Sequence, residues 1–152
     1  MDQELISKME SAGQRFDFYG PQSLESIEQL EMLLDVRLPP SYREFLHTLG
    51  GGGYSLEGGF CGIFDNDPSL IEGGTTYGET VIAREEIGLP HHLIVILHDS
   101  DLMIYWCLDF SRQRPDSECP VVGFDSETRA TTGDVGATFR DVLLNYLSGT
   151  ER

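Results

Sequence analysis

LIVILHDSDLMIYWCLDF, residues 93–110, contains two strongly apolar runs on either side of a short polar linker. Runs of this kind, here 93–97 and 102–110, are typical of strands that are buried on both faces of a sheet. A linker as tight as residues 98–101 joins two strands as an antiparallel hairpin. The stretch therefore predicts a β-hairpin at the centre of a sheet.

Helical patterns precede the hairpin. Leu5, Ile6 and Met9 lie at helical spacing, and Gly13 is a suitable end for this first helix. A second helix follows Ser23, whose side chain can accept a hydrogen bond from a first-turn amide. The apolar face expected for the second helix consists of Leu24, Ile27, Leu30, Leu33 and Leu34.

A third helix is expected after Leu38-Pro39-Pro40, because proline fits the first helical turn, where its missing amide costs nothing. Gly50 can adopt the left-handed conformation that ends such a helix. The apolar side of the third helix consists of Tyr42, Phe45, Leu46 and Leu49.

The other segments add short strands and two more helices. Extended segments are expected at residues 16–19, 54–56, 59–64 and 119–124. One helix runs from Tyr77 towards Glu86 and ends at Gly88. The apolar face of a final helix is expected to consist of Val135, Phe139, Val142, Leu143 and Tyr146. The chain, residues 1–152, is thus predicted to be a single α+β domain with helices packed against a central antiparallel or mixed sheet.

The chain is strongly acidic, since 10 Lys and Arg stand against 26 Asp and Glu, for a formal net charge of −16. Such a surface repels phosphate groups, and no run of Lys or Arg is present to release counterions. We therefore expect binding to neither nucleic acid nor an anionic membrane. Two explanations of the acidity stay open, namely solubility alone and association with a basic partner.

Residues with reactive side chains form no recognised catalytic or metal-binding motif. The cysteines are Cys61, Cys107 and Cys119. Their odd number and the absence of CxxC spacing favour a reducing cytosol. The densest group of possible metal ligands is His91, His92, His98, Asp99 and Asp101. Its spacing fits no zinc motif, because adjacent residues of a strand face opposite ways. We expect no metal, no cofactor and no enzymatic activity.

The expected location is cytoplasmic. The residues after Met1 lack the basic start and the apolar stretch of a signal peptide. The apolar runs at 93–97 and 102–108 are also too short to span a bilayer.

Four short motifs follow one another along the chain: Leu38-Pro39-Pro40, Tyr42-x-x-Phe45-Leu46, Gly88-Leu89-Pro90 and Cys119-Pro120-Val121-Val122. Their order and spacing resemble domains of the SUKH superfamily, of the Smi/Knr type. The resemblance extends over about residues 24–147 and leaves out the first twenty or so residues. It departs at Asp99-Ser100-Asp101, where relatives often have a turn that contains glycine.

The resemblance implies a non-enzymatic domain that binds another protein. Bacterial members are predominantly immunity proteins that neutralise secreted polymorphic toxins, many of them nucleases, and fungal members are regulatory scaffolds of cell-wall signalling. A nuclease presents basic residues to phosphates, so an acidic inhibitor suits the first role, and a scaffold is the alternative. The carboxylates expected to contact the partner are Glu57, Asp65, Asp67, Glu72, Asp99 and Asp101.

Overall fold

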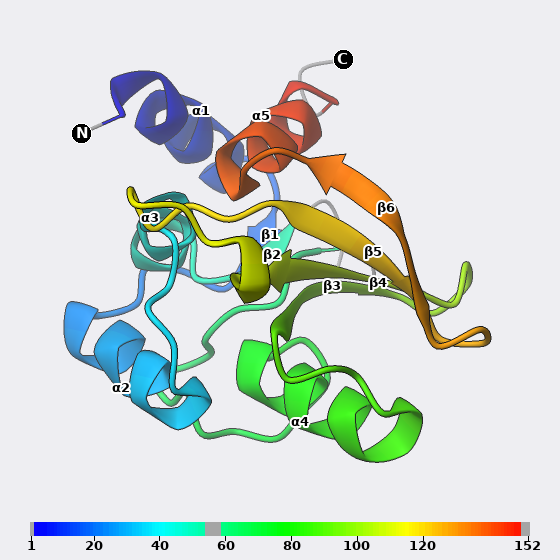
Figure 1. Ribbon diagram of the computed structural model, residues 1–152. Helices are drawn as coiled ribbons and strands as arrows, with labels where there is room; N and C mark the ends of the chain where they lie inside the picture. Colours follow the sequence, from blue (N-terminus) through cyan, green and yellow to red (C-terminus); the bar gives the residue numbers. More distant parts are fainter. Residues whose placement is uncertain (1, 54–58, 150–152) are drawn as a thin grey trace.

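The computed structural model of the protein describes residues 2–53 and 59–149 (Figure 1). The helices are α1 (Gln3–Gly13), α2 (Leu24–Leu34), α3 (Pro40–Thr48), α4 (Thr76–Ile87) and α5 (Phe139–Gly149). The strands are β1 (Asp17–Phe18), β2 (Gly52–Gly53), β3 (Leu93–Asp99), β4 (Ile104–Asp109), β5 (Val121–Asp125) and β6 (Ala130–Gly136), and a 3-10 helix (Phe110–Arg112) follows β4. The predicted α+β fold is confirmed.

The main sheet has the strand order β3-β4-β5-β6, and each neighbouring pair is antiparallel. The predicted hairpin is confirmed, with Ile94 opposite Leu108 in the register of β3 and β4. β1 and β2 form a separate antiparallel pair. Of the two sheet types that the sequence left open, the four-stranded sheet is therefore antiparallel.

Alternate residues of β3 face two different hydrophobic clusters. Ile94 and Ile96 belong to the larger cluster, which includes residues of α1, α2, α3 and α5. Leu93 and Val95 belong to the smaller cluster, which includes Ala83 of α4. Figure 1 shows α4 on one side of the sheet and α1, α3 and α5 on the other. The prediction of a strand buried on both faces is confirmed, since all four β3 side chains are 0% exposed.

The position of the hairpin in the sheet differs from the prediction, because β3 lies at the edge and β4 and β5 lie inside. Other groups occupy the polar backbone of this edge. The Val95 amide donates to Thr80 Oγ1 (3.0 Å), and the Cys61 amide donates to the Ile96 carbonyl oxygen (2.7 Å). The segment around Cys61 and helix α4 therefore cover this edge of β3, in the place that another strand would otherwise occupy. The second strand of the hairpin is also shorter than expected. β4 begins at Ile104, and Leu102, which was expected in the apolar run, is exposed.

The C-terminal region contains a strand that the sequence did not indicate. β6 includes Val135, which was expected in the final helix, and α5 begins only at Phe139. Nearly every residue of β6 is exposed, so the strand has no apolar alternation to reveal it. Residues 59–64 form isolated bridges at Phe60, Gly62 and Phe64 in place of the expected strand, since each residue pairs with a different segment. The strand expected at 54–56 lies outside the described residues.

Local helix signals were reliable. Ser23 Oγ accepts from the Ser26 amide at the start of α2, and Gly88 ends α4 at φ 67°. Gly50 has φ 79° directly after α3, and a Cβ there would overlap the carbonyl oxygen of Gly20. Glycine is therefore required at Gly50 for both conformation and space.

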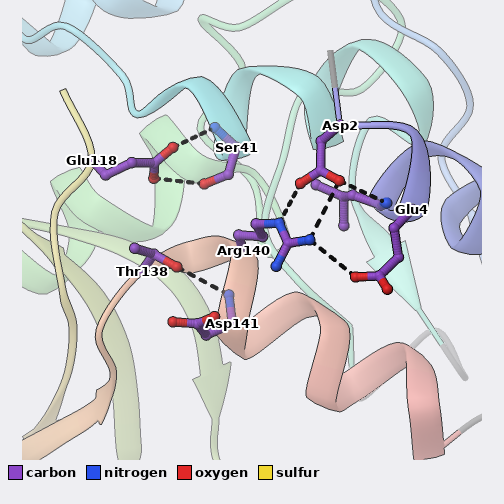
Figure 2. A network of polar contacts seen from close by, with 8 residues as sticks. Asp2, Glu4, Ser41, Glu118, Thr138, Arg140 and Asp141 are labelled. Atoms are coloured by element: carbon purple, nitrogen blue, oxygen red, sulfur yellow. Dashed lines mark hydrogen bonds and ion pairs between the residues drawn. The ribbon is translucent and has the colours of Figure 1, made fainter. Parts of the chain in front are cut away.

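The start of α3 is capped from a distant part of the chain. Pro39 at the N-cap offers no side-chain hydrogen bond. Instead, the Glu118 carboxylate accepts from the Ser41 amide (3.0 Å) and from Ser41 Oγ (2.7 Å), as Figure 2 shows. A carboxylate at a helix N-terminus satisfies free amides and interacts favourably with the helix dipole. Glu118 thereby ties the segment before β5 to α3.

We expect Glu118→Ala to lower the free energy of unfolding by about 1–2 kcal/mol, because the Ser41 amide loses its charged acceptor. Urea denaturation measures the change. Glu127→Ala is the matched control, since Glu127 is an exposed glutamate in the turn between β5 and β6. Equal stability of the two variants would contradict the role of Glu118 as a cap.

α1 is attached to α5 by a second polar contact (Figure 2). Arg140 forms ion pairs with Asp2, the N-cap residue of α1, and with Glu4 (3.0 Å). The Arg140 hydrogen bond lowers the pKa of Asp2, although partial burial opposes this shift. The first helix is therefore part of the folded unit, in a region that the family resemblance had left out.

Candidate functional site

α2 exposes large apolar side chains to solvent. Met32 is 81% exposed, Leu24 53% and Leu33 42%, whereas Ile27 and Leu30 of the same helix are completely buried. The sequence placed Leu24 and Leu33 on one apolar face with Ile27, Leu30 and Leu34, but the structure leaves Leu24 and Leu33 exposed. Single exposed apolar residues are common, but a group on one helix indicates a binding surface.

Two grooves flank α2. A groove of about 420 Å³ separates Met32 and Leu33 from residues 67–69. A second groove, of about 650 Å³, lies between α2 and α3 and is lined by charged groups that include Glu28 and Glu44. The helix is thus a ridge with an apolar groove on one side and a charged groove on the other. We call the ridge and its neighbouring loop, namely Leu24, Glu25, Glu28, Met32, Leu33 and residues 65–69, the α2 surface.

The loop of the α2 surface is held against the start of α2 by Asn66. Asn66 Oδ1 accepts from the Ser23 amide (2.7 Å), and the Asn66 amide donates to Oε1 of the buried Gln22 (2.7 Å). Asp67 Oδ1 accepts from the amide (3.1 Å) and hydroxyl (2.6 Å) of Ser69 within the loop. These bonds hold the loop that carries Asp65 and Asp67 against the start of α2, and Asp67 lines the apolar groove.

The carboxylates around α2 have different environments. Glu31 forms an ion pair with Arg43 and accepts from the Leu38 amide (2.7 Å), so it stabilises the turn between α2 and α3. Glu25 and Glu28 are exposed on the outer side of the helix. These two carboxylates are available to a partner and surround the exposed apolar side chains with negative charge.

The structure separates the six carboxylates predicted to contact a partner. Asp65 and Asp67 lie beside α2, and the exposed Glu72 follows in the same segment before α4. Asp99 is the last residue of β3 and Asp101 lies in the turn to β4. In Figure 1 this turn is far from α2, at the other end of the molecule. Asp99 Oδ1 accepts from the Leu102 amide (3.0 Å), a contact that shapes this turn. Glu57 lies outside the described residues.

Sequence reasoning missed a small pocket between the two sheets. Four glycines (52, 59, 73 and 74) line it, together with Asp17, Tyr19, Cys61, Glu79 and His98, and its volume is about 190 Å³. Glu79 Oε2 lies 3.3 Å from His98 Nδ1, and Glu79 Oε1 accepts from the Gly74 amide (3.3 Å). The Tyr19 hydroxyl donates to the Gly74 carbonyl oxygen (3.1 Å). We call this cavity the glycine pocket. Its residues come from five separate segments, so no local motif could reveal it.

The thiol of the glycine pocket is poorly suited to nucleophilic chemistry. Burial raises the pKa of Cys61 well above its usual value, and the Glu79 carboxylate raises it further. A thiol in this state is protonated at neutral pH and unreactive.

Residues 2–53 and 59–149 contain no group of three or more His, Cys, Asp or Glu side chains arranged to hold a metal ion. Within the same ranges, no helix has the length and apolar character needed to cross a bilayer.

A comparison with protein families agrees with the architecture and the motifs. The SUKH_5 family model, described as SMI1-KNR4 cell-wall, matches residues 3–148. The match includes α1, which the motif resemblance did not reach. The chain therefore belongs to the SUKH_5 family of SMI1-KNR4 proteins.

Proposed function

We propose that the protein is a non-enzymatic immunity protein, which binds and neutralises a cognate polymorphic toxin with a basic surface, such as a nuclease. The contact is made by the α2 surface. The observation that carries this proposal is the exposure of Met32 and Leu33 beside an apolar groove and among carboxylates.

Apolar and acidic groups on one surface suit such a partner for different reasons. Exposed apolar side chains that become buried in a complex supply most of the affinity. Complementary charge increases the association rate and rejects partners of the wrong sign. A nuclease has to present Lys or Arg to bind phosphates, so the substrate site of a nuclease is attractive to a chain with a net charge of −16.

The proposed action requires no catalysis and no cofactor. An inhibitor that occupies the substrate surface of a toxin acts by binding alone. A nuclease toxin acts on nucleic acid in the cytoplasm, so we propose that the protein works in that compartment.

Protection of cells tests the proposal. Where the neighbouring gene encodes a secreted toxin, the C-terminal domain of that toxin is the probe, and a neighbourhood without a toxin gene would favour the scaffold role instead. Cells that express the toxin domain should survive when this protein is co-expressed, and the purified pair should form a complex that high salt weakens. Absence of both protection and a complex would overturn the proposal. Recovery of a signalling or structural protein as the stable partner would instead support a scaffold role.

A further inference from the structure

We propose that the glycine pocket receives the guanidinium group of an arginine side chain from the bound partner. The inference rests on the proposed function, because the arginine belongs to the basic partner. It adds a second contact, separate from the α2 surface, and specifies the chemistry recognised there.

The pocket has the size and walls of a socket for one side chain. A volume of 190 Å³ corresponds to about six water molecules. A Cβ on Gly74 would lie 2.5 Å from the Tyr19 hydroxyl oxygen, and one on Gly52 would lie 2.5 Å from the Asp17 carbonyl oxygen, so these walls require glycine. A Cβ on Gly73 would meet Glu79 Oε1 at an ordinary 3.7 Å. The space beside Glu79 is therefore open on the Gly73 side.

The Glu79 carboxylate is the main hydrogen-bond acceptor of the pocket. Glu79 Oε1 accepts from the Gly74 amide and Glu79 Oε2 contacts His98 Nδ1, and a carboxylate has about four acceptor sites. Asp17, an exposed residue, also lines the pocket. A planar guanidinium with five donors matches such a site better than a point charge does.

The electrostatic environment of the pocket also favours a cation. Burial raises the pKa of Tyr19 to about 12, and the negative charge of Glu79 contributes to that increase. Burial likewise raises the pKa of Tyr105, again with a contribution from Glu79. Burial disfavours a charge of either sign, so only the contribution of the Glu79 carboxylate to these shifts favours a positive group in the pocket. The Tyr19 ring adds an aromatic wall, on which guanidinium groups pack well.

NMR titration of the full chain with N-acetyl-L-arginine N-methylamide tests the inference. We expect saturable amide shifts centred on Gly73 and Gly74, together with a shift of the His98 ring. The citrulline compound of the same shape is uncharged and is the matched control. It should cause no saturable shift, because the interaction depends on the positive charge.

Two variants make the test independent of any single side chain. Glu79→Gln retains an oxygen that can accept from the Gly74 amide but removes the charge, and Gly73→Val fills the open side. Each should weaken binding of the arginine compound by about tenfold or more. Glu85→Gln, an exposed position on the same helix, should bind like the unmodified protein.

The outcomes separate this inference from the proposed function. Absence of a saturable shift in the unmodified protein, or unchanged binding by both pocket variants, overturns the arginine socket. If arginine binding fails in this way but the unmodified protein still protects cells against the toxin, the proposed function stands and only the arginine site is rejected. If the arginine compound binds as described but no protection is found, the socket stands and the immunity role fails.

Discussion

Phe139→Ala is expected to lower the free energy of unfolding by about 3–5 kcal/mol, the range for loss of a fully buried phenylalanine. Phe139 is 0% exposed, and its ring centroid lies 4.9 Å from that of Tyr42 and 5.4 Å from those of Phe45 and Phe60. α3, α5 and the segment after β2 meet at these four rings. The cavity left by alanine would remove contacts from all three.

Urea denaturation of Phe139→Ala and Phe64→Ala measures this effect. Phe64 is 51% exposed and contacts the Tyr19 ring at 5.7 Å, so its removal should cost less than about 1 kcal/mol. If Phe139→Ala does not fold, Phe139→Leu should still show a loss of about 1–2 kcal/mol. Equal losses at Phe139 and Phe64 would contradict this description of the core.

The double variant Met32→Lys, Leu33→Lys should bind the toxin domain at least about 30-fold more weakly, a loss of about 2 kcal/mol or more. Both side chains are exposed, so their replacement should leave the fold intact. The new positive charges would repel a basic partner and remove the apolar anchors at the same time. Isothermal titration calorimetry gives the dissociation constant.

Leu102→Lys, Met103→Lys is the control for this binding test. Leu102 is 69% exposed and Met103 42%, and both lie in the turn between β3 and β4, away from α2. The control makes the same change of charge and apolar character. It should bind nearly as tightly as the unmodified protein. An equal loss for the two double variants would show that overall charge, and not the α2 surface, controls binding.

The sequence predicted those elements whose signals are local. Ser23, Pro40 and Gly88 mark helix ends because capping depends on a few neighbouring residues. The apolar run at 93–97 predicted a buried strand because both of its faces are covered. In these cases the structure depends on the properties of neighbouring residues, which the sequence shows directly.

Elements that depend on distant contacts were not predictable. β6 is exposed along nearly its whole length, and β3 is an edge strand because Thr80 and Cys61 satisfy its backbone. Glu118 caps a helix that begins almost eighty positions earlier in the chain. Periodicity alone could not show that Leu33 is exposed. Leu33 lines a groove at the surface of α2, and a leucine in such a groove has the same sequence signature as a buried one.

The candidate site was predictable only in part. Asp65 and Asp67 were identified from loop composition, and Asp67 lies beside the exposed Met32 and Leu33 of α2. Asp99 and Asp101 were identified by the same reasoning but lie at the other end of the molecule. Charge and loop position describe a residue, whereas a surface depends on which loops the fold brings together.

The central claim is that a basic toxin binds the α2 surface, and the association rate with the toxin domain tests it most directly. Two variants, Asp65→Asn with Asp67→Asn and Asp99→Asn with Asp101→Asn, each remove two negative charges and change the net charge from −16 to −14. Asparagine retains the side-chain oxygen on which the turns at Asp67 and Asp99 depend. In stopped-flow measurements at low salt, we expect the first pair to slow association several-fold and the second pair, which lies next to His98 of the glycine pocket, to slow it less. Equal rates for the two variants, or slower association for the second pair, would contradict the account.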